Sequence, residues 1–362
     1  MVRFPGARLL VPVALLAVAA CGDDPVQPDL NPTQVTQQVT KVTSALASPA
    51  MQDLVSLSGF FTLGAPPPAM SVATGALGLI HHSAELTVAG MASQRETVRA
   101  LLAARPSFGV AGAAAVLPVE ALGVTFIYNP STTQYEPSEL AGAPDDGVRF
   151  LLYAVDQLDQ PVVPLVQTGY LDLRDLSTST SGVIRLTAVT SGTTFADYQV
   201  SASGSETSGT VGVNGFVLGP DGTRVDVAFS ISETDTTASL TSVLAVASEG
   251  FTVSTNLSFS LAGDGTETAT VSITVQAAGA SMQIAGTLVS DAGTVAVTVN
   301  NQPFATITLA PEVEPTIEPA PGTTLSPEDI QAIQAVFGLG LVGVVFVLLV
   351  FVAPVAFLFG GI

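Results

Sequence analysis

The segment RVDVAFSI at 224–231 and the segment FTVSTNLSFSL at 251–261 decide the fold, because apolar residues recur in them at every second position. The same alternation returns at 269–277 and at 294–299. A period of two with many β-branched residues predicts strands that bury one face and expose the other. The intervening positions are mostly Ser, Thr, Asn, Gln and Ala, so the exposed face is polar but nearly uncharged.

Turn residues separate these segments at intervals of 14 or 15 residues, at Asp221-Gly222, Asp235, Glu249-Gly250, Asp264-Gly265, Gly279 and Gly293. Strands of about ten residues joined by tight turns indicate an antiparallel meander. We therefore predict a mainly β protein with one antiparallel β domain over residues 107–310. The sheet either packs as a sandwich or curls, and we favour a curled sheet with N-terminal helices on its concave side.

The first 20 residues have the features of a signal peptide. Arg3 and Arg8 precede an apolar run that is too short to span a bilayer, and the run ends in Val18-Ala19-Ala20-Cys21. This ending resembles the lipobox of bacterial lipoproteins. The resemblance implies cleavage before Cys21 and lipid attachment to Cys21; the alternative is an ordinary secretory signal with an unrelated cysteine. Residues 21–33 are rich in Pro and Asp and predict a mobile tether.

Residues 34–106 form the predicted helical or irregular N-terminal segment. Apolar residues at helical spacing predict one helix over 34–47, at Val35, Val39, Val42 and Leu46. A capping box made by Ser93 and Glu96 predicts a second helix over 97–105.

The C-terminal region begins with a predicted Pro-rich linker at 311–325. A helix follows over 326–362, with Ser326 as its N-cap and Pro327 at its first position. Residues 335–362 carry no charge, so we predict a transmembrane helix here. The alternative is a hydrophobic hairpin buried in the core of the β domain.

The chain contains few groups for catalysis or metal binding. Cys21 is the single cysteine, which excludes an intramolecular disulfide and a multi-cysteine zinc site. His81 and His82 are adjacent, so on a strand they point to opposite faces. The spacing Gly-x-Gly-x-x-Gly at 338–343 lies in an apolar helical run, not after a strand, so it predicts no dinucleotide site. We predict no catalytic residue, no cofactor and no metal site.

The net charge of −20 makes nucleic-acid binding unfavourable, because the phosphate backbone repels an acidic surface. The predicted partners are membrane lipids, together with an apolar ligand or another envelope protein. The sequence predicts a location in the bacterial cell envelope, with the β domain outside the cytoplasm. The inner membrane is favoured, because a spanning helix would hinder transfer to an outer membrane.

We therefore predict a non-enzymatic, envelope-anchored lipoprotein that acts as a scaffold or binds apolar or lipid ligands. One alternative is a transmembrane β-barrel, since strands of ten residues have the required length. The scarcity of aromatic residues for interfacial girdles counts against it. A second alternative is an envelope hydrolase, which only the abundance of Ser and Asp favours.

Overall fold

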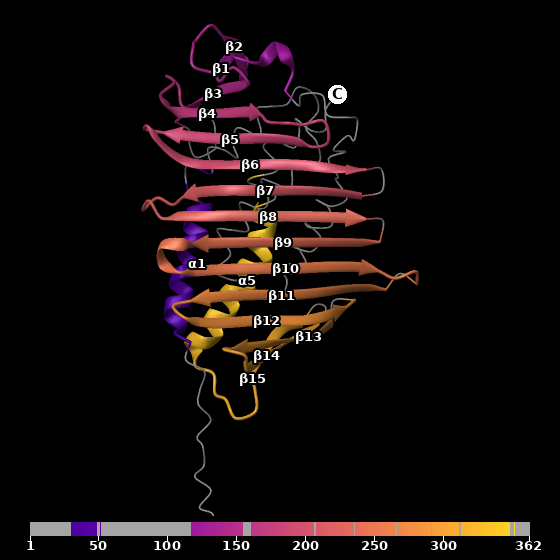
Figure 1. Cartoon of the computed structure of the whole chain (residues 1–362). Helices are drawn as coiled ribbons and strands as arrows, with labels where there is room; N and C mark the ends of the chain where they lie inside the picture. The colour runs from indigo at the N-terminus through magenta and orange to yellow at the C-terminus, as the bar shows by residue number, and fades with distance from the viewer. Residues whose placement is uncertain are drawn as a thin grey trace, which may run out of the picture.

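One large β-sheet dominates the computed structural model of the chain (Figure 1). The structure describes residues 30–48, 51, 117–154, 161–205, 208–234, 236–264, 266–290, 292–310, 313–347 and 351. Its elements in chain order are α1 (Pro32–Leu46), η2 (Val119–Ala121), β1 (Thr125–Asn129), β2 (Gln134–Ser138), β3 (Gly147–Tyr153), β4 (Gln167–Asp175), β5 (Gly182–Thr190), β6 (Thr193–Ser205), β7 (Ser208–Leu218), β8 (Arg224–Thr234), β9 (Thr237–Val246), η3 (Ala247–Glu249), β10 (Phe251–Leu261), β11 (Glu267–Ala277), β12 (Ala280–Val289), β13 (Ala292–Val299), β14 (Gln302–Ala310), β15 (Val313–Pro319) and α5 (Pro327–Val347).

The sheet has 15 strands, and from β3 to β15 each strand pairs with the next one along the chain. These pairs are antiparallel, which confirms the predicted mainly β meander. The first two strands depart from this order, because β1 lies between β2 and β3 and pairs with β3 in parallel. The sheet is open, with β2 at one edge and β15 at the other.

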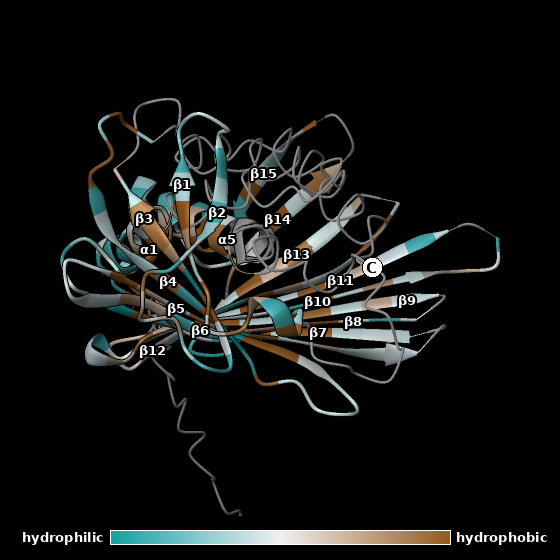
Figure 2. Cartoon of the chain, turned by 90° about the horizontal axis from the view of Figure 1, so that it is seen from above, coloured by the Kyte–Doolittle hydropathy of each residue, from teal (hydrophilic) through white to brown (hydrophobic). Residues whose placement is uncertain are grey.

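The sheet curls around the two helices. Figure 2 shows α5 in the hollow of the curve, with β1–β3 on one side and β13–β15 on the other. Helix α1 contacts β7 and β8, α5 contacts β10 and β11, and the two helices contact each other. The sheet is therefore curled, the form that the sequence favours, and α1 lies on its concave side. The several N-terminal helices of the prediction are not supported, because α1 is the single N-terminal α-helix among the described residues.

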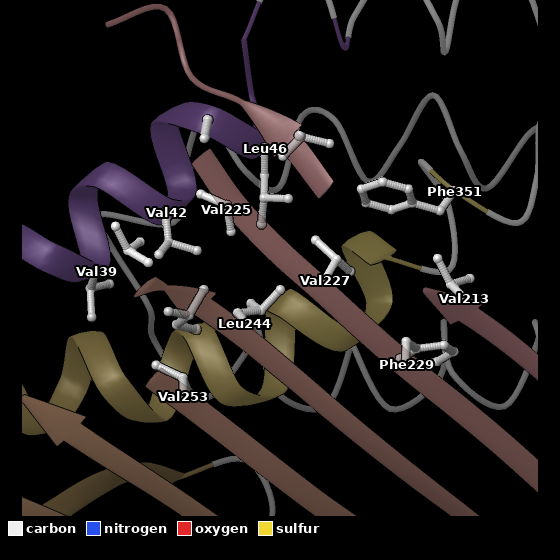
Figure 3. Close-up of a cluster of buried hydrophobic side chains, with 14 of the residues drawn as sticks. Val39, Val42, Leu46, Val213, Val225, Val227, Phe229, Leu244, Val253 and Phe351 are labelled. Carbon is white, nitrogen blue, oxygen red and sulfur yellow. The ribbon is translucent and has the colours of Figure 1, made fainter. Parts of the chain in front are cut away.

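The hydrophobic core lies between the concave face and the helices. Figure 3 shows Val39 and Leu46 of α1 pointing toward the same space as Val225, Val227 and Leu244 of the sheet. Each of these side chains is buried. The alternation in the sequence supplies this face, since every second residue of each strand points toward the helices.

The first helix follows its sequence signals closely. The Asn31 side chain accepts a hydrogen bond from the Gln34 backbone N–H at 3.0 Å, which caps the helix start. The predicted apolar positions of α1, Val35, Val39, Val42 and Leu46, are all buried. The second predicted N-terminal helix, at 97–105, lies outside the described residues.

The predicted transmembrane helix at 326–362 is not supported. Among the described residues, no helix combines the length and the apolar character needed to cross a membrane. Helix α5 instead packs inside the curl of the sheet, where Ile333, Val336 and Phe337 are buried. The physical reason is that a helix buried on all sides in a protein core has the same uniformly apolar sequence as a membrane span. The start of α5 is as predicted: the Asp329 N–H donates to Ser326 Oγ at 3.1 Å.

Part of the predicted Pro-rich linker at 311–325 forms the edge strand β15. It pairs with β14 in an antiparallel ladder, in which Ala305 lies opposite Pro319 at one end and Ala310 lies opposite Val313 at the other. Proline lacks a backbone donor but is compatible with an edge strand, where one side of the backbone needs no partner.

Candidate binding face

In the described part of the chain, both α-helices pack on the concave face of the sheet and neither covers the convex face. On the concave side, a Cβ added to Gly340 of α5 would lie 2.5 Å from Cδ1 of Ile273 on β11. Glycine thus brings the backbone of α5 into direct contact with the sheet. The convex face is therefore the surface that the fold presents to solvent.

Bidentate ion pairs cross the convex face at its β3–β6 end. Arg149 donates to both carboxylate oxygens of Asp172 at 2.7 and 2.8 Å. Arg185 donates likewise to Asp197 at 2.9 and 2.7 Å. The hydrogen bond to Asp197 raises the pKa of Arg185, so the arginine keeps its charge. These pairs join neighbouring strands and neutralise charge on this part of the face.

Two more arginines also pair with carboxylates. Arg174 donates to both oxygens of Asp146 at 2.8 and 2.7 Å, and this contact lowers the pKa of the Asp146 carboxyl. Arg224 pairs with Asp226 at 2.8 Å and lies 3.9 Å above the centre of the Phe216 ring. Each arginine in the described part of the chain therefore has a carboxylate partner.

A row of hydroxyl side chains crosses the rest of the convex face. Ten successive strands, β6 to β15, each place a Ser or Thr at the same register position. The members of this hydroxyl row are Ser203, Thr210, Ser232, Ser239, Ser258, Thr270, Thr287, Thr294, Thr308 and Thr316. Nine of the ten are exposed and Ser232 is half-buried. The row contains no ionisable side chain.

A shallow groove of about 380 Å³ adjoins the hydroxyl row over β5–β9. Its lining includes Gly212 and Ala228, which have little or no side chain, and the amides of Asn214 and Gln199. Ser201, Ser230 and Thr241 add hydroxyls, each two residues along its strand from a member of the row. The polar groups of the groove are thus neutral and both donate and accept hydrogen bonds, and apolar residues such as Val183 and Val243 form most of the remaining lining.

The site residues that the sequence singled out are not among those that the structure describes. Cys21, the predicted lipid attachment site, and His81 and His82 lie outside the described residues. Within the described residues, no group of three His, Cys, Asp or Glu side chains is placed to hold a metal ion. Asp221 accepts from the backbone N–H of Thr223 at 2.9 Å in the β7–β8 turn, as expected for a hairpin turn.

The hydroxyl row could not be predicted from the sequence alone. Each strand shows its own alternation, but the row depends on how ten strands are aligned with one another. The intervals between its members vary, for example seven residues from Ser203 to Thr210 and 22 from Thr210 to Ser232. A prediction of the turn residue at every hairpin would have fixed the register and revealed the row.

Comparisons with known proteins give no relative from which a role could be inferred. No protein-family model matches the chain. No curated protein and no solved structure matches it either.

Proposed function

We propose that the protein is a non-enzymatic, lipid-anchored protein of the bacterial cell envelope, in which the curled sheet is a scaffold that presents its convex face for binding. The observation that carries this proposal is the position of α1 and α5, which pack buried side chains on the concave face at β7, β8, β10 and β11. A carrier of apolar ligands needs an accessible apolar cavity under the sheet. In the described part of the chain, the protein's own helices occupy that place.

The anchor in this proposal is the lipid on Cys21, and the support for it is the Val18-Ala19-Ala20-Cys21 sequence. The preference for the inner membrane depended on a spanning C-terminal helix, which the structure does not support. The proposal therefore keeps the cell envelope and the extracytoplasmic position of the sheet, but not the choice of membrane. Metabolic labelling with an acyl analogue should mark the wild type and leave Cys21→Ser unlabelled.

Presentation of the convex face can be tested by cysteine labelling in cells. Thr270 and Ile273 lie on the same strand, β11, but Thr270 is exposed on the convex face and Ile273 is buried on the concave face. In full-length protein expressed in a bacterial host, a membrane-impermeant maleimide should label Thr270→Cys in spheroplasts and should not label Ile273→Cys. An acylated Cys21 has no thiol and gives no background. Labelling of Ile273→Cys alone, or of neither variant, would contradict the proposal.

The carrier function remains distinguishable by mass spectrometry. Native spectra of the detergent-extracted protein should show the acylated chain without a further lipid in fixed stoichiometry. A lipid that stays bound at one molecule per chain after detergent exchange would favour the carrier over the scaffold.

A further inference from the structure

We propose that the convex face binds a neutral, extended polysaccharide chain that runs across the strands along the hydroxyl row. This inference rests on the proposed function, because it names the ligand of the face that the scaffold presents. It is carried by the register of the row, by the neutral groove beside it and by the shape of the sheet.

The spacing of the row matches a linear chain of pyranose rings. Neighbouring strands lie about 4.8 Å apart, so ten strands place hydroxyls at that interval over roughly 40 Å. A pyranose ring in an extended β-linked chain advances the chain by nearly the same distance. Each successive sugar can therefore meet one Ser or Thr, such as Thr270, Thr287 and Thr294 on three adjacent strands.

The chemistry of the row and the groove selects a neutral ligand. Hydroxyls and the amides of Gln199 and Asn214 donate and accept hydrogen bonds, as sugar hydroxyls do. No lining side chain of the groove is ionisable, and the net charge of −20 disfavours anionic polymers. The aromatic rings of Tyr170 and Phe216 on this face are covered by Arg149 and Arg224, so sugars would bind through their hydroxyls and not by stacking.

The shape of the sheet favours a flexible polymer over the other occupants. Strands β13–β15 curve away from the plane of β6–β12 (Figure 1), so a rigid flat surface such as a crystal face cannot touch the whole row. An extended peptide would add to a free strand edge, but both edge strands contain proline: Pro137 in β2, and Pro315 and Pro319 in β15. A polysaccharide can follow the curve and make one weak contact on each strand.

Native affinity electrophoresis of the full-length protein in detergent tests this inference. The acidic protein migrates readily, and a polysaccharide in the gel retards it when the two bind. The probes are hydroxyethylcellulose, which is neutral and extended; carboxymethylcellulose, which has the same backbone with negative charge; and dextran, which is neutral but not extended. We expect hydroxyethylcellulose to retard the protein. Carboxymethylcellulose and dextran should leave its migration unchanged.

The variant that removes the contacts is Thr270→Val/Thr287→Val/Thr294→Val. Valine keeps the shape and the strand preference of threonine but removes the hydroxyl. Loss of three neutral hydrogen bonds should weaken the binding of hydroxyethylcellulose by about tenfold or more. The matched control is Thr252→Val/Thr274→Val/Thr298→Val, on the same face but outside the row, and it should bind as the wild type does. Unfolding midpoints verify that both variants are folded. If the triple variant of the row does not fold, the single variant Thr287→Val takes its place in the binding experiment.

The outcomes that would overturn the inference are distinct. The inference is wrong if hydroxyethylcellulose does not retard the wild type, or if all three polymers retard it equally. It is also wrong if the control variant loses as much affinity for hydroxyethylcellulose as the row variant does. Sedimentation of the same proteins tests a second copy of the chain as the occupant: self-association that the row variant alone abolishes would overturn the inference. If Thr270→Cys is labelled in spheroplasts while retardation is absent, the scaffold proposal stands and only the ligand is wrong.

Discussion

Tyr198 of β6 shows how this core treats polar groups. Its side chain is fully buried against Phe351, with the ring centres 4.6 Å apart, and its hydroxyl has no hydrogen-bond partner among the described residues. Burial raises the pKa of Tyr198, so the hydroxyl stays protonated. A buried donor without a partner costs stability because it has lost its hydrogen bonds to water.

Tyr198→Phe should therefore stabilise the protein by about 1 kcal/mol, since it removes the unpaired hydroxyl and keeps the ring contact. Tyr135 is the matched control, because its hydroxyl donates to the Leu151 carbonyl at 2.8 Å. Tyr135→Phe should lower stability by about 1 kcal/mol. Urea denaturation of the two full-length variants measures both changes, and destabilisation of equal size in both would contradict this assignment.

At the scale of elements, the contact between α5 and the sheet depends on Gly340. An alanine methyl at this position would meet Cδ1 of Ile273 at 2.5 Å, and Ile273 is fully buried. Overpacking costs about 1–3 kcal/mol, while alanine gains at most about 1 kcal/mol in helix propensity. Gly340→Ala should therefore destabilise the protein.

Adding Ile273→Val to Gly340→Ala should recover part of the loss, because valine lacks the Cδ1 atom that the new methyl meets. The double-mutant cycle, measured by urea denaturation, isolates this coupling. Additive effects of the two substitutions would mean that α5 does not pack on β11 at this point.

Helix α1 is held to the sheet by a polar contact as well as by its apolar face. Lys41 and Gln38 of α1 donate hydrogen bonds to Glu249 in η3, and these contacts, that of Lys41 foremost, lower the pKa of Glu249. A carboxyl with a lowered pKa stabilises the folded state above its ordinary value of 4.5. That contribution is lost as the pH falls through the lower pKa of the folded protein.

The wild type should therefore lose more stability between about pH 7 and pH 3 than Glu249→Gln, whose amide does not titrate. Other carboxylates titrate equally in both proteins, so the difference between their urea midpoints at each pH isolates Glu249. The effect should be small, because Lys41 and Glu249 are partly exposed. An identical pH dependence in the two proteins would show that the contact does not contribute.

At the scale of the whole molecule, an open sheet has two edges that can pair with other chains. Both edge strands carry proline and glutamate, as Glu136 and Pro137 in β2 and Pro315, Glu318 and Pro319 in β15. Proline removes backbone N–H donors from the edge, and the negative charge of glutamate repels the same edge of a second molecule. These residues account for the composition that resembles a linker.

Pro315→Thr/Pro319→Thr should restore donors at the β15 edge and cause slow self-association, visible as light scattering that grows with time. Pro220→Thr, in the exposed turn between β7 and β8, is the control and should remain clear. Equal scattering from both variants would show that the effect is not a property of the edge.

Local features of this molecule could be predicted from its sequence, while features that depend on long-range pairing could not. The cap at Ser326 follows from residue types within the first turn of α5. The buried positions of α1 follow from apolar residues that recur every three or four positions. Local spacing is also enough for β10, where Phe259 faces the core and Ser258 is exposed, as the alternation predicts. The position of α5 could not be predicted, because an apolar helix suits a membrane and a protein core equally. The hydroxyl row required the register of ten strands.

The most direct test of the account is whether α5 lies inside the curl of the sheet in the full-length protein. A Gly340→Cys/Ile273→Cys variant places two thiols where the backbone of α5 meets β11, since a Cβ at position 340 would lie 2.8 Å from Cγ1 of Ile273. Mild oxidation should join them, detected by the loss of two hydrogens in the mass of a linked pair of chymotryptic peptides, since no Lys or Arg lies between the two positions. Gly340→Cys/Thr270→Cys, with the second thiol on the convex face of the same strand, should remain reduced. Failure of the first pair to oxidise, with Gly340→Cys protected by lipid instead, would contradict the account and place α5 in the membrane.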